Sequence, residues 1–403
     1  MTIDWRSATL AVLIVPLLPI SILLWRRWVE RRAAGFLVAL FAAWSLLCVP
    51  YMIGFSGAYD AFPWLTFAPF NTEAWLGPLI FLYASALTRT TAPPRARLLL
   101  APGAVITAYY TGCFVLLGSA ENKFAFTNAV HQPYVYPVET LIGLALAAYG
   151  VWAAWRAIGA YRSWLAGARA DYDAFDLAYL RGFLVTVVAV VALWIVFDLV
   201  ELLVGGIPYA QAFWVYVVVG IAVLGLGLDA LTRVDRVYPK MDAEPVRVDA
   251  AALGRRTPPP PSLPDLAGRI RQEGWARDAN LTIGALSRRV GVNESALSAA
   301  INERADMNFN TMINALRVED ACAALLAAPP DRTIYEIALD CGFGSKATFN
   351  RVFRERVGMT PSQWRRAGST SQIPQFAPSD ETETPAPPGA AKPIAGGEEG
   401  STT

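Results

Sequence analysis

The sequence predicts an all-α protein in two parts: a bundle of seven transmembrane helices and, after a linker, a domain of paired helices. Three observations lead to this fold class. Hydrophobic residues make up 55% of the 403 residues, and the mean hydropathy is +0.37. Seven apolar runs occupy the first 230 residues, and the chain then turns abruptly polar. Capping residues and glycines divide the remaining segment into pieces of helical length.

The seven apolar runs have the length expected of membrane spans. A helix needs about 20 residues to cross a hydrocarbon core of about 30 Å, and it pairs its own backbone groups in lipid. The third run reaches that length only if it starts near Trp64. The runs cover residues 8–25, 34–55, 74–88, 98–118, 135–155, 182–204 and 208–230.

The basic residues predict how these helices are oriented. Fourteen Lys and Arg residues follow the odd-numbered runs, whereas the alternate segments carry only Arg6 and Lys123. Cytoplasmic loops are enriched in Lys and Arg, so we expect the N-terminus outside and the C-terminal third in the cytoplasm. A positive cluster after the first run also favours a retained anchor over a cleaved signal peptide. The fourteen are Arg26, Arg27, Arg31, Arg32, Arg89, Arg95, Arg97, Arg156, Arg162, Arg169, Arg181, Arg233, Arg236 and Lys240.

Other seven-helix classes fit these residues less well. A retinal Schiff base needs a lysine within the bundle, but Lys123, Lys240, Lys346 and Lys392 all lie outside the predicted spans. A transporter more often shows broken helices at repeated positions. The four cysteines form no CxxC or Cys/His cluster, which argues against a zinc site or a disulfide framework. The single histidine, His131, rules out any mechanism that needs a histidine pair. We expect no metal, no cofactor and no enzyme activity.

Four ionisable residues near the predicted outer side are candidates for sensing a signal. Asp198 and Glu201 share one face of the sixth span. Glu139 opens the fifth span, and His131 lies in the outer loop before it. Ionisable groups within a membrane are candidates for function. The alternative is structural: an interfacial or helix-bonding role for the acidic pair, and a plain loop position for His131.

Two segments have a composition that is unsuited to a packed core. Residues 233–264 contain TPPPPSLP, which cannot continue a helix or strand, and they predict a semi-rigid spacer. Residues 368–403 are poor in large apolar side chains and rich in Pro, Gly, Ser and Thr, which predicts disorder. The predicted domains are therefore residues 1–232 and residues 265–367.

Residues 265–367 contain two helix pairs built in the same way. In the first, Thr282 caps one helix, Gly291 permits the turn, and Asn293 caps the next helix. In the second, Thr333 begins a capping box and Gly342 makes the turn. A small residue at each crossing and an apolar anchor in each second helix are typical of helix-turn-helix units. The small residues are Ser287 and Ala338, and the anchors are Leu297 and Phe349.

A linker helix is predicted between the two units. FNTMINALRVEDACAALLA is amphipathic and 19 residues long, which corresponds to roughly 28 Å. One turn of DNA is about 34 Å, so two recognition helices at this separation would reach successive major grooves.

The second helix of each pair would carry the contacts to DNA. Arginine and lysine neutralise phosphates, and arginine also binds guanine edges in a bidentate way. In the first unit the expected recognition helix, NESALSAAIN, has no basic residue, although its Glu294 could accept a hydrogen bond from cytosine. A protein-binding module with a merely solvated charged face is the alternative. The candidates are Asn293, Glu294, Ser295 and Ser298 in the first unit, and Ser345, Lys346, Thr348, Asn350, Arg351 and Arg354 in the second.

Residues 281–366 resemble the DNA-binding domain of the AraC/XylS family of bacterial transcription regulators. The run EIALDCGFGSKATFNRVFRERVGMTPSQWR is close to the family signature, and LSAAINERADMNFNTMINALRVEDACAALL is similar to its first unit and linker helix. LGPLIFLYASALT also resembles a phrase of the membrane-embedded subgroup.

This resemblance implies a membrane-bound regulator in the bacterial inner membrane. Its expected partners are double-stranded DNA, the lipid bilayer and a small-molecule or envelope signal, and it is expected to bind DNA as a homodimer. The alternative is a seven-helix receptor or transporter whose C-terminal module binds protein.

Overall fold

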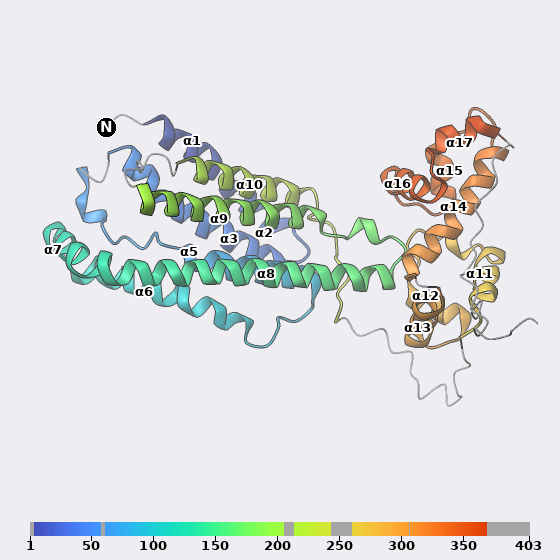
Figure 1. The fold of residues 1–403 in the computed structure, drawn as a ribbon, viewed down its shortest axis with the longest axis horizontal. Helices are drawn as coiled ribbons and strands as arrows, with labels where there is room; N and C mark the ends of the chain where they lie inside the picture. The colour runs from blue at the N-terminus through green and yellow to red at the C-terminus, as the bar shows by residue number, and fades with distance from the viewer. Residues whose placement is uncertain (1–3, 58–60, 205–212, 243–259, 306, 369–403) are drawn as a thin grey trace, which may run out of the picture. The chain divides into compact units, whose positions relative to one another are not determined.

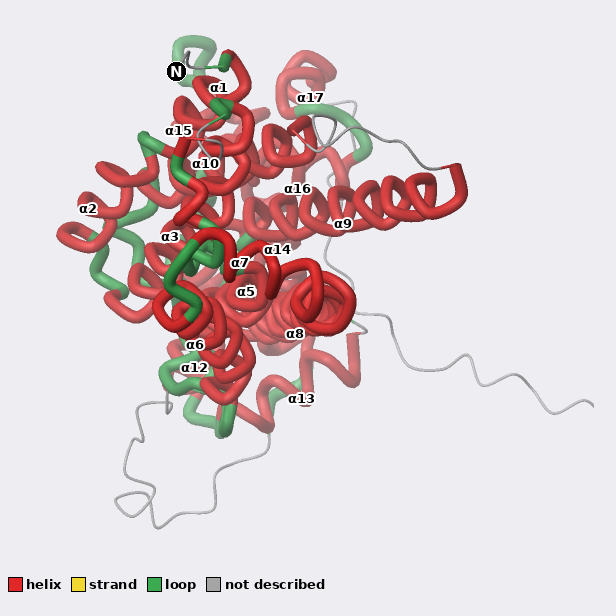
Figure 2. Tube along the Cα trace, turned by 90° about the vertical axis from the view of Figure 1, so that its left-hand side faces the viewer, coloured by secondary structure: helices red, strands yellow, loops and turns green. Residues whose placement is uncertain are grey.

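The computed structural model describes residues 4–57, 61–204, 213–242, 260–305 and 307–368, without the side chains of 193–204 and 303–305. The chain forms two compact units. The N-terminal unit comprises Met1–Ala166 and Tyr172–Gly254, and the C-terminal unit comprises Gly167–Asp171 and Arg255–Thr403. Helices dominate the described residues, and Figure 2 shows no strand among them. An isolated bridge joins Arg169 to Thr282.

The N-terminal unit is built from long apolar helices joined by short loops (Figure 1). A π-helical stretch, Thr127–Val135, joins two of these helices without a break. The helices are α1 (Trp5–Ile14), α2 (Leu17–Arg27), α3 (Arg31–Phe55), α5 (Glu73–Thr88), α6 (Ala101–Leu116), α7 (Ala120–Phe126), α8 (Tyr136–Ala168), α9 (Ala178–Val204) and α10 (Phe213–Leu231).

Five helical stretches of the described chain are long and apolar enough to cross a membrane. They are Trp5–Arg27, Arg31–Phe55, Ala96–Leu116, Ala120–Ala168 and Phe213–Leu231, and each overlaps a predicted run. The third run forms α5, which has only 16 residues or about 24 Å. The sixth run forms α9, a helix of 27 residues.

The short helix α5 lies in the interior of the N-terminal unit. Its residues from Leu79 to Thr88 are all buried, and it touches α8 backbone to backbone. A Cβ atom placed on Gly77 would lie 2.1 Å from the carbonyl oxygen of Leu146, and one on Gly150 would lie 2.1 Å from that of Gly77. Small residues allow such close approach between helices. Being surrounded by other helices explains why α5 is apolar all round.

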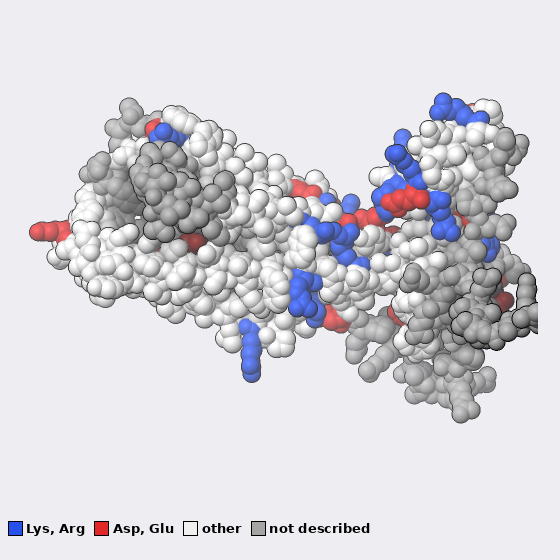
Figure 3. Space-filling model, viewed as in Figure 1, with Lys and Arg blue, Asp and Glu red and all other residues white. Residues whose placement is uncertain are grey.

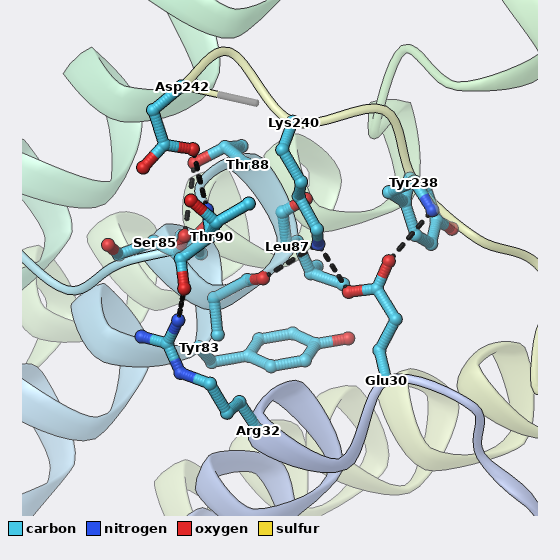
Figure 4. A network of polar contacts seen from close by, with 12 residues as sticks. Glu30, Arg32, Tyr83, Ser85, Leu87, Thr88, Thr90, Tyr238, Lys240 and Asp242 are labelled. Carbon is cyan, nitrogen blue, oxygen red and sulfur yellow. Dashed lines mark hydrogen bonds and ion pairs between the residues drawn. The ribbon is translucent and has the colours of Figure 1, made fainter. Parts of the chain in front are cut away.

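The basic loops meet at one end of the N-terminal unit (Figure 4). Lys240 donates to the Glu30 carboxylate at 2.5 Å and to two carbonyl oxygens at the end of α5 at 2.9 Å each. Asp242 accepts from the backbone N–H of Thr90 at 2.6 Å, and Arg32 donates to the carbonyl of Thr90. The start of the predicted spacer is thus held against the ends of α2, α3 and α5.

The loop between α8 and α9, the fourth of the basic loops, lies at the same end, in contact with the loop that follows α10. Arg236 donates to the carbonyl of Ala174 at 2.9 Å, and Arg233 lies 4.3 Å from the ring of Tyr179 while pairing with Asp229. On the face drawn in Figure 3, most of the surface of this unit is uncharged, and its Lys and Arg side chains gather mainly at one end. The four segments that carry the predicted basic excess are therefore neighbours in space.

In its described part the C-terminal unit contains the α-helices α11 to α17, all labelled in Figure 1, and the short 3₁₀ helix Trp275–Arg277. The predicted 19-residue linker helix is confirmed, from Phe309 to Ala327. It contributes Phe309 and Leu316 to one apolar core, and Val318 and Leu325 to a second. The helices are α11 (Leu263–Gln272), α12 (Ile283–Val290), α13 (Glu294–Ala305), α14 (Phe309–Ala327), α15 (Ile334–Asp340), α16 (Lys346–Val357) and α17 (Pro361–Ala367).

The predicted caps of the C-terminal unit are present. The Thr282 hydroxyl accepts from the N–H of Ala285 at 3.1 Å, and Asn293 accepts from that of Ser295 at 2.8 Å. Thr333 and its N3 glutamate form the reciprocal capping box. Each cap satisfies a backbone donor that the first helical turn leaves unpaired, so the helix starts follow from local sequence.

Candidate nucleic-acid interface

Aromatic packing holds α16 in place. The ring of Phe349 lies 5.0 Å from that of Phe343 and 5.4 Å from that of Phe353, and Phe353 lies 6.3 Å from Trp364. The Trp364 indole N–H donates to the carbonyl of Cys322 on α14 at 3.1 Å. Because one face of α16 is buried in this way, the opposite face must point outward.

The turn before α16 is close-packed. Gly342 has φ of +90°, which favours glycine. A Cβ atom at this position would lie 2.5 Å from the carbonyl oxygen of Ala276. The turn of the second unit therefore contacts the short helix Trp275–Arg277 that precedes the first unit, and no side chain fits between them.

The outward face of α16 is basic. Lys346, Asn350, Arg351 and Arg354 are all exposed, as predicted. Neither Lys346 nor Arg354 forms an ion pair within the described part of the chain. Arg351 instead pairs with Glu355 one turn later, with nitrogen–oxygen distances of 3.0 and 3.1 Å. An exposed i, i+4 pair is worth only about 0.3–0.5 kcal/mol, so a guanine or phosphate could displace it.

Two predicted contact residues of the second unit also cap the helix. The Ser345 hydroxyl accepts from the N–H of Thr348 at 3.1 Å and bonds the Thr348 hydroxyl at 2.9 Å. Both side chains are half-buried. Their first role is therefore to fix the start of α16.

The face of α13 differs in chemistry. Asn293, Glu294 and Ser295 are exposed, and Ser298 is half-buried. The Asn293 amide oxygen accepts from both the N–H and the hydroxyl of Ser295, at 2.8 and 2.5 Å. The stretch NESALSAAIN carries no basic side chain, but α13 is longer than this stretch: it continues to Ala305 and includes Arg304, whose side chain lies outside the described residues.

Two charged residues near these faces were missed from the sequence. An exposed arginine on α12, Arg288, approaches the same glycine, Gly284, as Glu294 does: a Cβ atom there would lie 2.9 Å from Glu294 Oε2 and 3.6 Å from Arg288 Nη1. Glu355 adds a carboxylate to the face of α16. The i, i+4 spacing of Arg351 and Glu355 was the available signal for the second.

A second polar cluster lies in the N-terminal unit around Glu139. Its Oε1 accepts from the Tyr110 hydroxyl at 2.7 Å and from the Asn71 amide at 3.2 Å, and it lies 3.9 Å from His131 Nε2. The Tyr109 hydroxyl bonds His131 Nδ1 at 3.1 Å. The other Glu139 oxygen is buried without a partner in the described residues. Two of the predicted sensing residues are thus brought together.

The expected loop position of His131 is wrong. It lies in the π-helical stretch Thr127–Val135 and is 6% exposed. Lys123, placed in the same predicted loop, lies in α7 and donates from its buried ammonium to the carbonyl of Trp64 at 2.7 Å. The helical structure therefore begins well before the fifth apolar run. Lys123 and His131 can be buried there because Trp64 and Tyr109, from other segments, form hydrogen bonds with them. The side chains of Asp198 and Glu201 lie outside the described residues.

A cavity of about 510 Å³ adjoins the Glu139 cluster. Asn71 and Tyr110 line the cavity and also bond Glu139. The polar side chains of the cluster therefore lie at the edge of a cavity whose wall is mainly aromatic and aliphatic. Its wall includes Trp44, Tyr51, Glu73, Tyr136, Tyr216 and Val223. An apolar cavity with a few convergent polar groups is the usual form of a small-molecule site.

The C-terminal unit has the geometry of a tandem helix-turn-helix domain, and comparison with known proteins supports this. Residues 286–367 match the family model described as "Helix-turn-helix domain". No solved structure matches the chain significantly.

Curated relatives are similar to about a fifth of the chain. An uncharacterized HTH-type transcriptional regulator of Staphylococcus aureus strain COL is 38% identical over 86 residues, which is 21% of this chain and 11% of that protein. The corresponding protein of strain MSSA476 has the same identity and coverage. The HTH-type transcriptional activator RhaR of Klebsiella pneumoniae is 34% identical over 76 residues, 19% of this chain and 26% of that protein. The chain thus aligns with only a small part of each relative.

Proposed function

We propose that the chain is a membrane-bound, sequence-specific DNA-binding transcription regulator of the AraC type. The observation that carries this proposal is the basic, outward face of α16, held by its aromatic core next to the turn at Gly342. The match of residues 286–367 to a helix-turn-helix family supports it. Two copies would bind DNA together, each placing α13 and α16 in successive major grooves.

The N-terminal unit is proposed to be a seven-span sensor in the bacterial inner membrane. The N-terminus is outside and the helix-turn-helix domain is cytoplasmic. Five apolar helices of sufficient length and the meeting of the basic loops at one end support this. A reporter fused after Lys240 should be active inside the cell, and one fused at Ala120 should be active outside. The reverse pattern excludes the proposal, since a DNA reader outside the membrane has no target.

The signal is proposed to act at the Glu139 cluster, together with Asp198 and Glu201. The buried carboxylate oxygen without a partner and the adjoining cavity support this placement. Glu139→Gln and the double variant Asp198→Asn/Glu201→Gln should each alter the transcriptional response to the signal. A parental response in both variants assigns these residues a structural role.

DNA binding is tested with the full chain in lipid nanodiscs. Duplexes enriched from a random pool should bind more tightly than scrambled ones, and affinity should fall steeply with salt as counterions are released. A triple variant with Lys346, Arg351 and Arg354 changed to Ala should lose this binding. If parent and triple variant bind no duplex, the protein-binding alternative for the C-terminal module is favoured.

A further inference from the structure

The short segment Gly167–Asp171 begins with the last two residues of α8 and continues toward α9, and it belongs to the C-terminal unit. Ala170 is 2% exposed and lies in the apolar core that also contains Leu281 and Phe309. The N–H of Ala170 donates to the carbonyl of Leu281 at 3.0 Å, beside the bridge between Arg169 and Thr282. The loop that connects two apolar helices thus completes the core of the first helix-turn-helix unit.

The linker helix α14 binds this segment through Asn310. The Asn310 amide nitrogen donates to the carbonyl oxygens of Ala170 and Arg169, at 2.8 and 3.3 Å. Its amide oxygen accepts from Asn314 at 3.0 Å. Both ends of the Asn310 amide are therefore used, and buried backbone carbonyls require partners of this kind.

A buried arginine, Arg317, also contacts the segment. Arg317 is 2% exposed and donates to the carbonyls of Ala276 and Asp278 at 2.8 Å each, and to that of Ala170 at 3.4 Å. Burial lowers the pKa of Arg317 to about 10, although Asp171 and Asp278 act in the opposite direction. A buried guanidinium is costly unless carbonyl groups surround it, so the Ala170 carbonyl is part of its required shell.

The segment is also shaped for docking. Arg169 and Asp171 form a two-point ion pair, with nitrogen–oxygen distances of 2.6 and 2.8 Å. This pair spans Ala170 and holds its carbonyl and N–H in the conformation that Asn310 and Leu281 bind. A segment preorganised in this way loses little conformational entropy on docking.

We propose that Gly167–Asp171 is an intramolecular docking segment that couples the apolar helices to the linker helix α14. The α8 helix begins next to Glu139 and runs without a break into the segment, so a displacement of α8 moves the residues that Asn310 holds. Because α14 contributes to both apolar cores, a shift of its first turn changes the placement of α13 relative to α16. The docking stands on the contacts alone, whereas its effect on DNA binding rests on the proposed function.

Docking is tested by the isosteric change Asn310→Asp in the full chain in nanodiscs. Aspartate keeps the oxygen that accepts from Asn314 and suits the first turn of a helix, but it cannot donate to the carbonyls of Ala170 and Arg169. Amide hydrogen exchange in residues 167–171 should become about tenfold faster, because local opening is easier.

The matched control is Thr311→Ala at the neighbouring position. Thr311 is exposed, and its hydroxyl bonds only the capping residue Asn308, so exchange in residues 167–171 should stay at the parental rate. Exchange in α16 should be parental in both variants, which shows that the domain remains folded. If residues 167–171 exchange as an open loop in the parent, or equally in all three proteins, the docking proposal is wrong.

Coupling is tested by inserting four Gly/Ser residues between Ala166 and Gly167, where the chain passes from one unit to the other. The insertion leaves the contacts of Arg169, Ala170 and Asp171 intact but interrupts their helical link to α8. Transcription from a promoter bound by the chain should change at least about threefold, while hydrogen exchange in residues 167–171 stays parental. Unchanged output from a bound promoter overturns the coupling. Parental protection without DNA binding by any form contradicts the proposed function and leaves the docking intact.

Discussion

The recognition helices α13 and α16 share a scaffold but differ in chemistry. Each has 12 residues and follows a turn glycine with positive φ. Each has a fully buried anchor, Leu297 in α13 and Phe349 in α16. Yet α16 presents two arginines, a lysine and an asparagine, whereas the described face of α13 offers hydroxyls, an amide and one carboxylate.

This difference indicates that the first unit mainly positions the domain on DNA, whereas the second unit reads the base sequence. Contacts to phosphates position a protein on DNA, whereas contacts to base edges specify the sequence. The first unit has Arg288 of α12 near its recognition helix and holds the docking segment. The second has the side chains suited to bidentate base contacts.

The largest expected effect distinguishes the two turn glycines. Gly342→Ala should destabilise the second unit by about 3 kcal/mol, since an unfavourable φ is combined with a clash against the carbonyl of Ala276. Gly291→Ala has the same backbone strain, but a Cβ atom there meets nothing within 4 Å, so about 1 kcal/mol is expected. Hydrogen exchange of α12 and α16 amides in the full chain measures both. Equal losses would show that the turn of the second unit is not the more tightly packed one.

The next largest effect concerns base reading. Arg351→Ala should weaken specific binding by about 1–3 kcal/mol, as for loss of a bidentate base contact. Ser298→Ala on α13 is the matched control and should stay within about 0.5 kcal/mol of the parent. Competition gel shifts on the selected duplex and on single-base variants measure both changes. Should Ser298→Ala cost as much as Arg351→Ala, the first unit also reads bases.

A smaller effect is expected for Lys346, which we assign to a phosphate. Lys346→Ala should weaken selected and scrambled duplexes alike and reduce the slope of log affinity against log salt by about 1. Lys346→Arg keeps the charge and should restore the slope. A loss confined to the selected duplex would move Lys346 to the group of base-reading residues.

The smallest effect concerns Glu355, whose carboxylate holds Arg351 in the free protein. Glu355→Gln removes a negative charge from the DNA face and releases the arginine, so affinity should rise by about 0.3–0.5 kcal/mol. In the background of Arg351→Ala the same change should have a smaller effect, because the two residues are coupled. Full additivity in this double-mutant cycle would mean that the ion pair does not restrain Arg351.

Local sequence was sufficient to predict most of the C-terminal unit. Caps, turn glycines and the ends of α14 depend on residues within one or two helical turns, and they occur where the spacing of Thr282, Asn293 and Gly342 placed them. The exposed side of α16 followed from the positions of its apolar residues. The ion pair between Arg351 and Glu355 was missed, although their i, i+4 spacing indicates it.

The polar cluster around Glu139 could not be predicted in the same way. Its members come from the segment before α5, from α6, from the π-helical stretch and from α8, and only packing of these segments brings their side chains within hydrogen-bonding distance. The prediction that His131 lies in a loop was wrong, because a polar residue outside the apolar runs was expected to face solvent. The tyrosine hydroxyls that satisfy it lie more than 20 residues away.

Sequence patterns were sufficient to predict the all-α class, the apolar helices, and the two helix-turn-helix units with their linker helix. Each of these depends on periodicity and on contacts between near neighbours. The burial of Ala170, in a loop between apolar helices, in the core of the first unit became visible only in the folded chain. A small residue in a short loop has no distinguishing sequence pattern. Its docking depends on Asn310 and Arg317, which lie more than 130 residues later in the chain and donate hydrogen bonds to its carbonyl oxygen.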